Sequence, residues 1–547
     1  MDTATVYTRR WWALAVLCLS LLVIGLDNTI LNVALPALVH DLNASTSQLQ
    51  WIVDGYTLVF AGLLLTAGSL GDRFGRKGAL GTGLVVFCAG SLASAMSQSA
   101  TMLTLTRAFM GIGAALIMPA TLSLLTNIFT DQKERARAIG VWAAVAGGGS
   151  AIGPLLGGFL LHHFWWGSVF LINVPVTIVA FVAGRFLLPV SRDPSAPKLD
   201  PVGALLSVAG LIALLWSIIE APAKGWTDST VVASFLIGVI VLVGFVVWEL
   251  KSDHPMLDVR FFENRRFTAA NASITLIFFA MFGSMFLITQ YLQIVLGFNA
   301  LEAGIRMLPM AAVMLVVAPM SPRLVERVGT KLVVGVGLLL AAGGLFFASG
   351  VPATNGYPHL LLSMGILSFG MGLVMAPATE SIMGSLPPSK AGVGSAMNDT
   401  TRQMGGALGV AVIGSIFATS YRPGISSALT KLGAPAAVVA AAKDSVGGAM
   451  AAASHLPVAL RGLVMASARN EFVHAFGTAS KIGGGVILVA AAVVFLFLPA
   501  HAEAARQPVD GALDGIASLT FAEAEGQLEA DAAAAAADPE LVREPAG

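Results

Sequence analysis

The chain has 547 residues, of which 56% are hydrophobic and only 11% charged, and its 31 basic and 31 acidic residues give a formal net charge of zero. Soluble domains carry about 25% charged residues. This composition, with a mean hydropathy of +0.81, therefore excludes a soluble globular protein and predicts an integral membrane protein. Cys18 and Cys88 both lie in apolar runs, which excludes a disulfide framework and a cysteine zinc site.

The first predicted element is an apolar run at residues 11–36, which is long enough to cross a bilayer as one helix. Arg9 and Arg10 precede it as in a signal peptide. The run is too long for a signal peptide and contains Asp27, so we interpret it as a retained first span. A charge near the middle of a membrane helix costs on the order of 3 kcal/mol. Asp27 is therefore a candidate functional residue.

Further apolar runs follow along the chain, and together they predict fourteen membrane helices. The runs lie near residues 12–36, 50–70, 79–98, 102–128, 138–161, 166–188, 202–220, 230–249, 268–296, 303–322, 332–350, 358–384, 393–420 and 480–499. Because the number is even, both termini are expected on one side of the membrane. Most Lys and Arg residues lie in the termini and in the even-to-odd connections, so the positive-inside rule places that side in the cytoplasm.

An internal repeat relates two parts of the chain. The run GSLGDRFGRK at 68–77 matches PRLVERVGTK at 322–331, with an acid, Arg, Gly and Lys in register. Each copy closes the second helix of a six-helix unit. The predicted fold class is all-α, with two parallel six-helix halves and two extra helices near 202–249 between them, which resembles the major facilitator architecture.

These patterns predict the organisation of the whole chain. We expect a cytoplasmic N-terminus (1–10), an N-terminal half (11–190), two extra helices with linkers (191–266), a C-terminal half (267–500) and a cytoplasmic tail (501–547). Residues 422–479, rich in Ala and Gly with scattered charges, are expected to form an outer loop with short amphipathic helices. The tail is rich in Ala, Asp and Glu and poor in aromatic residues, which predicts disorder.

The run GSLGDRFGRKGAL (68–80) predicts a tight inner loop between spans two and three. Its glycines allow a sharp turn and a close approach of helices, and its acid can brace the neighbouring arginines. We interpret the run as a structural gate latch, and the alternative is a simple anchor of positive charge. The candidate residues are Gly68, Asp72, Arg73, Gly75 and Arg76.

The run LTLTRAFMGIGAA (103–115) places Arg107 one to two turns inside span four from its outer end. An arginine in lipid needs an acidic or carbonyl partner, and Asp27 and Asp54 are the nearest acids in depth. We therefore predict a functional pair of Asp27 with Arg107. The alternative is a permanent salt bridge that only holds helices together.

The run GSAIGPLLGGFL (149–160) predicts a span that neighbours can approach closely. Gly153 and Pro154 loosen the helix, while Gly149, Gly157 and Gly158 allow close packing. The sharper interpretation is a movable, kinked seam, and the alternative is ordinary packing of small residues.

Other side chains within the spans are candidates for substrate contact. Asp54, near the outer mouth of span two, could attract a cation or cap a helix. Glu380 follows Pro377 near the inner end of span twelve, and Phe282 and Met285 of span nine either pack or line a soft cavity. Asp399 and Arg402, spaced i, i+3 on span thirteen, can form a secondary charge pair, for which local neutralisation is the alternative.

The three runs at 68–80, 103–115 and 149–160 resemble the signature loop, the span-four arginine motif and the span-five antiporter motif of major facilitator drug exporters. LDNTILNVALP (26–36) is similar to the span-one motif of the 14-span drug:proton antiporters of the EmrB/QacA type. The QacA/LfrA/SmvA branch in particular is similar at WIVDGYTL (51–58) and FWWGSVFLINVP (164–175), and AGVGSAMNDTTRQMGGALG (391–409) resembles the thirteenth-span motif. The resemblance covers roughly residues 10–500, with one departure at Met110, where glutamine is frequent.

This resemblance implies proton-driven export, with Asp27 and Arg107 as the proton-coupling pair. We expect a multi-pass transporter of the cytoplasmic membrane, not an enzyme, that exports amphipathic, cationic compounds in exchange for protons. Its expected partners are membrane lipid, protons and lipophilic small molecules, without nucleic acid, cofactor or metal. The alternatives are a dedicated exporter of one metabolite or antibiotic and a non-transporting receptor. The G-K-[ST] end of a Walker A loop is absent from the sequence, which argues against a self-contained ATP-driven pump.

Overall fold

The computed structural model describes residues 3–129, 131–191, 200–253, 255, 259–385 and 391–498, and within these ranges every regular element is a helix. The predicted all-α fold class is therefore confirmed. The predicted tail (501–547) and part of the linker before the extra helices lie outside the described residues.

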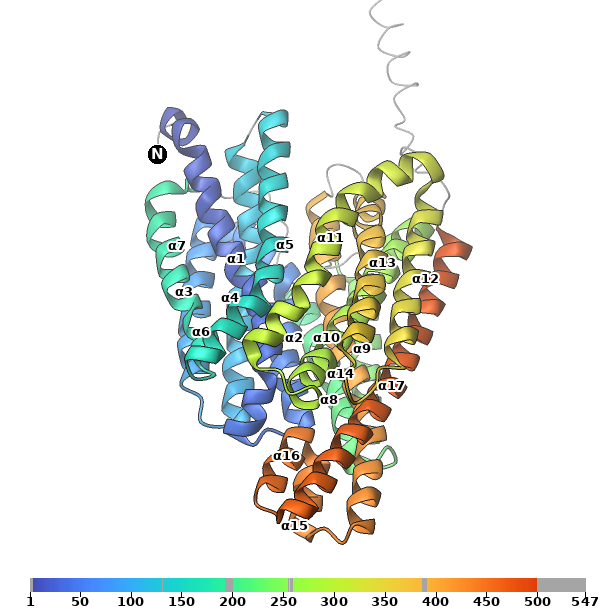
Figure 1. Ribbon diagram of the computed structural model, residues 1–547. Helices are drawn as coiled ribbons and strands as arrows, with labels where there is room; N and C mark the ends of the chain where they lie inside the picture. The colour runs from blue at the N-terminus through green and yellow to red at the C-terminus, as the bar shows by residue number, and fades with distance from the viewer. Residues whose placement is uncertain are drawn as a thin grey trace, which may run out of the picture. The chain divides into compact units, whose positions relative to one another are not determined.

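The helices form two bundles with a pair of helices between them in the chain (Figure 1). The N-terminal half contains α1 (Thr3–Leu42), α2 (Thr46–Phe74), α3 (Arg76–Ala95), α4 (Ala100–Ile128), α5 (Gln132–His163), α6 (Ser168–Leu171) and α7 (Asn173–Leu187). The middle pair is α8 (Pro201–Lys224) and α9 (Ser229–Lys251), followed by η1 (Val259–Glu263). The C-terminal half contains α10 (Arg265–Gln290), η2 (Tyr291–Val295), α11 (Ala300–Val328), α12 (Thr330–Ala348), α13 (Tyr357–Met383), α14 (Ala391–Lys431), α15 (Ala436–Asp444), α16 (Val446–Ser454) and α17 (Val458–Phe497).

The helix lengths agree with the predicted spans. Among the described residues, 12 segments are long and apolar enough to cross a membrane. The remaining long helices are α2 and α5, with 29 and 32 residues, so the architecture is consistent with fourteen spans. One predicted span, at 166–188, is divided at Ile172 into the short α6 and the longer α7.

The internal repeat extends over the full length of α2 and of its counterpart in the C-terminal half, α11. Both helices have 29 residues, and both begin with a capping box, at Ser45 and at Asn299. Both end at a glycine in the left-handed region, Gly75 with φ +120° and Gly329 with φ +84°. A glycine adopts these angles without steric cost. The same short turn therefore leads into α3 and into α12.

The two halves contact each other at the end of the molecule where α2 and α11 begin, which we call the closed end. Gln50 of α2 donates from Nε2 to the carbonyl oxygens of Val410 (3.1 Å) and Ala411 (2.9 Å) of α14. In the reverse direction, Gln293 of η2 donates from Nε2 to the carbonyl of Val33 in α1 at 2.8 Å. We call these contacts the cross-half clamps. The two bundles diverge toward the opposite end, where α1 begins (Figure 1).

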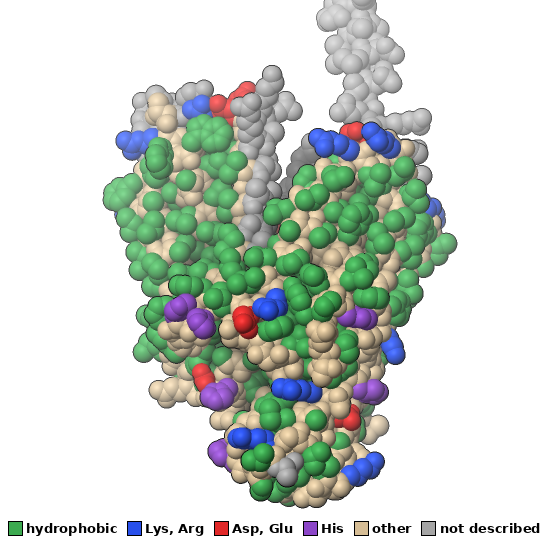
Figure 2. Space-filling view, viewed as in Figure 1, with side chains coloured by type: hydrophobic (Ala, Val, Ile, Leu, Met, Phe, Trp, Pro, Cys, Tyr) green, Lys and Arg blue, Asp and Glu red, His purple; other side chains and the backbone are tan. Residues whose placement is uncertain are grey.

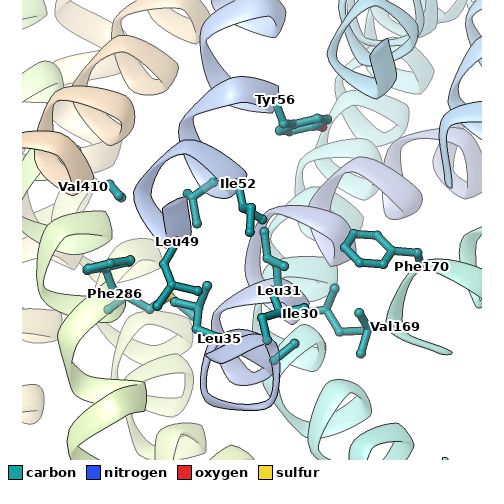
Figure 3. Packing of buried hydrophobic residues seen from close by; sticks show 14 of the residues in the cluster. Ile30, Leu31, Leu35, Leu49, Ile52, Tyr56, Val169, Phe170, Phe286 and Val410 are labelled. Atoms are coloured by element: carbon teal, nitrogen blue, oxygen red, sulfur yellow. The ribbon is translucent and has the colours of Figure 1, made fainter. Parts of the chain in front are cut away.

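Buried apolar side chains from both halves fill the space beside these clamps. Leu35 and Leu49 of the N-terminal half belong to the same buried cluster as Phe286 and Val410 of the C-terminal half (Figure 3). A second buried cluster is built by the C-terminal half alone. It lies nearer to the end of the molecule where α10 begins. The shared core thus lies toward the closed end.

A helical cap covers the closed end. It consists of α15, α16 and the adjoining ends of α14 and α17 (Figure 1). Thr46 Oγ1 of α2 donates to the carbonyl of Asp444 at 3.0 Å, and Gly447 lies against Val39 of α1. The expected outer loop at 422–479 is therefore largely continuous with α14 and α17. Alanine has the highest helix propensity, so the Ala-rich segment extends these helices beyond the spans.

The exterior carries large apolar side chains across the middle of both bundles, while Lys and Arg side chains lie at the end where α1 begins and also toward the closed end (Figure 2). On α9, for example, Phe235, Leu236 and Ile240 are exposed. Exposed apolar area of this extent is unfavourable in water and favourable in lipid. The surface is that of a multi-pass membrane protein.

Candidate functional site

Two oppositely charged side chains predicted to pair lie together inside the N-terminal half. Nη1 of Arg107, on α4, forms an ion pair with Oδ2 of Asp27, on α1. Both side chains are buried, with exposed fractions of 2% and 0%. Nε of Arg107 donates to the carbonyl oxygen of Ile52, on α2, at 3.2 Å. The arginine thus connects three helices through its own donors.

Aromatic rings enclose the same guanidinium group. Cζ of Arg107 lies 4.4 Å from the centre of the Tyr56 ring and 5.8 Å from that of Phe170. Figure 3 shows both rings in the buried cluster. A cation over an aromatic face is attracted by the ring quadrupole, more strongly where water is excluded. The positive charge is therefore stabilised by the rings as well as by Asp27.

Asn173 is a further partner of Asp27 that sequence reasoning missed. Its Nδ2 lies 3.4 Å from Oδ1 of Asp27 and donates to Oγ of Ser91, on α3, at 3.3 Å. The side chain of Asn173 is buried. Asn173 is the first residue of α7, directly after the break at Ile172. The available signal was a single amide side chain in the apolar run 168–187. A buried amide needs hydrogen-bond partners, although the run does not identify them.

Asp54 has no hydrogen-bond partner for either carboxylate oxygen within the described part of the chain, and its side chain is fully buried. The sequence predicted a position near the outer mouth. In this conformation the mouth is closed. Gln50 lies one turn earlier on the same face of α2 and forms a cross-half clamp. Asp54 therefore lies on the α2 face that approaches α14, sealed from solvent.

The other predicted charge pair is much looser. Nη1 of Arg402 and Oδ1 of Asp399, both on α14, are 4.0 Å apart, with side-chain exposed fractions of 27% and 13%. Nη2 of Arg402 donates to Oγ1 of Thr379, on α13, at 3.1 Å. Thr379 in turn donates to Oδ1 of Asn398 at 3.2 Å. We call Thr379, Asn398, Asp399 and Arg402 the C-half polar cluster.

The remaining substrate candidates differ in exposure. Glu380, next to Thr379 on α13, is exposed, whereas Met285 is buried in the cluster that the two halves share. Phe282 is partly buried and stacks on Phe278, with 6.2 Å between ring centres. Phe282 lies close to the C-half polar cluster through Phe278, since Cζ of Arg402 is 5.5 Å from the Phe278 ring centre.

The loop at 68–80 binds to the end of α7. The backbone N–H of Arg76 donates to the carbonyl of Ser191 at 2.9 Å, and its Nη1 donates to Oγ of Ser191 at 3.3 Å. Nζ of Lys77 donates to the carbonyls of Arg185 and Leu188 at 2.8 and 2.7 Å. In this conformation the loop therefore fastens helices within the N-terminal half.

Three of the remaining loop candidates are described in part. Arg73 is exposed, with Cζ 5.7 Å from the Phe74 ring centre. A Cβ atom at Gly68 would lie 3.5 Å from Pro119 of α4. The side chain of Asp72 lies outside the described residues. The contacts of Arg73 and Gly68 therefore lie within α2 and α4.

The glycines of α5 are packed against two different helices. A Cβ atom at Gly149 would lie 3.1 Å from Leu22, and one at Gly157 would lie 3.1 Å from the carbonyl of Ile30; Gly153 faces the same helix, α1. Gly158 instead faces α11, where a Cβ atom would lie 2.5 Å from the carbonyl of Ala300. Close approach at these positions requires glycine. Pro154 lies within the continuous helix α5, and its carbonyl faces Gly304.

Within the described residues, no group of three or more His, Cys, Asp or Glu side chains has the arrangement of a metal site. The polar groups inside the bundles include two Asp–Arg pairs and the isolated acid Asp54. An arrangement of this kind can bind and release protons and can orient charged or polar small molecules.

Comparisons with known proteins agree with this arrangement. A sequence profile described as Major Facilitator Superfamily matches residues 17–410. The chain is 36% identical over 493 residues to the multidrug efflux pump LfrA of Mycolicibacterium smegmatis, an alignment that covers 90% of this chain and 97% of LfrA. It is 34% identical to the tetracenomycin C resistance and export protein of Streptomyces glaucescens, with coverages of 89% and 91%. Among solved structures, a bacterial homologue of the human lysosomal transporter Spinster is similar with a TM-score of 0.60 at 17% identity, covering 90% of this chain and 98% of that one.

Proposed function

The chain belongs to the Major Facilitator Superfamily, and we propose that it exports amphipathic drugs or toxic compounds across the cytoplasmic membrane in exchange for protons. The relatives named above are drug and antibiotic efflux proteins, which supports export as the activity of this chain. Both halves, the buried Asp27–Arg107 pair and the loop at 68–80 are present in one chain. A receptor without transport would need none of the proton-binding groups.

We assign the end where α1 begins to the cytoplasm. The connections at that end carry many of the Lys and Arg residues of the chain, among them Arg76, Lys77 and Arg185, which supports this orientation through the positive-inside rule. The closed end, with its cross-half clamps and cap, then faces outward. The conformation is accordingly inward-facing, ready to receive a substrate from the cytoplasm or from the inner leaflet.

The observation that carries the coupling proposal is the sealed Asp27–Arg107 pair. An ionised carboxylate in this apolar interior is tolerated because the guanidinium group neutralises it. When a proton binds Asp27, the attraction between the two side chains is lost, and Arg107 keeps only the Ile52 carbonyl and the two rings. Proton binding therefore favours separation of α1 from α4, and release of the proton favours the paired arrangement.

For the substrate, we propose contact with the acids and aromatic rings of the central part of the bundles. Asp54 attracts positively charged compounds when the closed end opens, because a carboxylate between apolar walls exerts a potential of several kT. Glu380 contributes negative charge near the cytoplasmic end of α13. Phe282, together with the methionines near it, forms a wall that adapts to different shapes. Met285 is buried, so it supports this wall by packing and does not contact the substrate in this conformation.

Transport into energised inverted vesicles, with and without a proton uncoupler, tests the proposal. We expect uncoupler-sensitive uptake of several unrelated lipophilic cations by the native chain and none by Asp27→Asn at equal protein level. Asp228→Asn is the matched control, because Asp228 is a partly exposed N-cap residue and Asn is an equally good cap. Uptake of a single compound would support the dedicated exporter. Normal proton-driven uptake by Asp27→Asn would refute the coupling role, and absence of any uptake by the native chain would favour a receptor.

A further inference from the structure

The two Asp–Arg pairs inside the molecule differ in the way their charges are satisfied. Nη1 of Arg107 pairs with Asp27 and Nε donates to Ile52, and the pair is sealed from solvent. Arg402 approaches Asp399 only to 4.0 Å and keeps a quarter of its side chain exposed. A charged group that is both accessible and incompletely paired is the one that can gain from binding a ligand.

The unfilled hydrogen-bonding capacity of Arg402 can be followed atom by atom. A guanidinium group carries five N–H donors. Nη2 donates to Thr379, while Nε has no hydrogen-bond partner in the described part of the chain. The carboxylate of Asp399 is beyond normal hydrogen-bond distance from Nη1. Nε is itself buried, so the donors left for an acceptor supplied by another molecule are those of Nη1 and the second N–H of Nη2.

An aromatic surface lies beside these donors. Phe278 and Phe282 of α10 stack on each other, and the Arg402 guanidinium lies over Phe278. Gly406, one turn after Arg402 on α14, faces the Phe282 ring, where an added Cβ atom would lie 3.2 Å away. The absence of a side chain at Gly406 lets α14 pack closely against this side of Phe282. The ring is nevertheless only partly buried, so part of it remains accessible to a ligand. Met281, Met314 and Met375 pack nearby and are only partly buried.

The position in the fold also suits a ligand. Two residues after Arg402, Met404 joins the apolar contact of α14 with α2 and α8, which continues through Ala407 and Ala411 toward the closed end. Arg402 is therefore on the side of this contact that faces away from the closed end. It remains partly exposed in the conformation in which Asp54 is sealed.

We propose that Arg402 is a substrate-recognition residue that binds an oxygen acceptor, either a carbonyl or an anionic oxygen, of a planar aromatic compound whose ring system lies on Phe282. This inference rests on the proposed export function and extends its substrates beyond lipophilic cations. Thr379 and Asn398 hold the guanidinium group in place through their hydrogen-bond chain. Asp399 is an internal acceptor that competes with the ligand for Arg402.

The test measures equilibrium binding to the purified full-length protein in detergent by fluorescence anisotropy. The two probes are fluorescein, a planar aromatic anion with oxygen acceptors, and ethidium, a planar aromatic cation without oxygen. We expect Arg402→Gln to weaken fluorescein binding about tenfold or more, as for loss of a charge-assisted hydrogen bond, and to change ethidium binding less than about threefold. Arg402→Lys should retain only part of the fluorescein affinity, because lysine lacks the planar fork.

Arg306→Gln is the matched control. Arg306 also lies over aromatic rings, with Cζ 3.7 Å from the Phe298 ring centre, but it is near the closed end. Arg306→Gln should therefore leave the affinities for fluorescein and for ethidium unchanged. Asp399→Asn should tighten fluorescein binding, because it removes the competing acceptor and a repelling charge. A purely structural role of the pair predicts instead that Asp399→Asn weakens both probes.

Three results would overturn the assignment: no fluorescein binding by the native protein, equal loss of both probes in Arg402→Gln and Arg402→Lys, or an equal loss of fluorescein in Arg306→Gln. Should Arg402→Gln fail to fold, Arg402→Lys and Asp399→Asn decide the question. Failure of the export proposal is separate, since it would appear as absent proton-driven ethidium uptake in vesicles. The binding series would still report whether Arg402 recognises the acceptor.

Discussion

Removal of Arg107 and removal of the charge on Asp27 should have unequal effects on stability, although they break the same ion pair. In Arg107→Ala, Asp27 loses its ion-pair partner and keeps only the 3.4 Å approach of Asn173. In Asp27→Asn, Arg107 keeps the Ile52 carbonyl, the Tyr56 ring at 4.4 Å and the Phe170 ring. The amide oxygen of the new Asn can also still accept from Nη1.

The magnitude follows from the cost of an uncompensated buried charge. Removal of one partner of a buried pair costs about 3–5 kcal/mol, and Arg107→Ala also creates a cavity beside Tyr56 and Phe170 because the side chain is only 2% exposed. We therefore expect Arg107→Ala at the upper end of this range. For Asp27→Asn we expect about 1–2 kcal/mol, since a neutral acceptor replaces the charged one. The double variant Asp27→Asn/Arg107→Ala should be more stable than Arg107→Ala alone.

Reversible unfolding of the purified variants in mixed micelles, followed by tryptophan fluorescence, measures these free energies. The coupling free energy comes from the double-mutant cycle. Equal destabilisation by the two single changes would contradict the asymmetry of the contacts, and strict additivity in the cycle would show that the two side chains do not interact. A control pair, Arg10 and Glu134, forms two 2.8 Å hydrogen bonds at a partly exposed site, where we expect a coupling of about 1 kcal/mol at most.

Three other outcomes are expected. Asp54→Asn should leave the free energy of unfolding unchanged or raise it slightly, because it removes an unpartnered buried acid. It should also reduce resistance to dicationic compounds more than resistance to monocations, whereas an equal loss for all charge classes would assign Asp54 to coupling. Gln50→Ala combined with Gln293→Ala should open the closed end, detected as faster labelling of a cysteine at Leu49 by a membrane-impermeant maleimide; unchanged labelling would mean that the clamps are not limiting. Deletion of the tail from about residue 505 should preserve resistance at equal protein level, whereas loss of transport would show that the tail has a role.

Much of the architecture could be predicted from the sequence because lipid imposes strict rules on it. A long apolar run must be a helix in a bilayer, so the spans follow from their lengths. A buried arginine must find an acid or a carbonyl, so Asp27 was the expected partner of Arg107. The register of the repeat likewise predicted equivalent turns, which appear at Gly75 and Gly329.

The features that sequence reasoning missed depend on contacts between helices that are distant in the chain. The partnership of Asn173 with Asp27 requires the break at Ile172, which turns α7 toward α1 and α3. The burial of Asp54 depends on how closely α14 approaches α2, which no local pattern encodes. The cap between α14 and α17 also depends on tertiary support, because Asp444 of α15 contacts Thr46 and Gly447 of α16 contacts Val39.

Helix α2 connects the sealed charge pair to the closure between the halves. Ile52 accepts the hydrogen bond from Arg107, and Gln50, two residues earlier, forms the clamp to α14. A helix is stiff over this distance, so a shift of the Ile52 carbonyl must move Gln50 as well. Protonation of Asp27 would free Arg107 to move relative to Ile52, and α2 would carry that movement to the clamp. In the proposed mechanism, the proton therefore needs no contact with the substrate to influence which end of the molecule is open, because Asp27 acts through Arg107 and α2 on the clamp to α14.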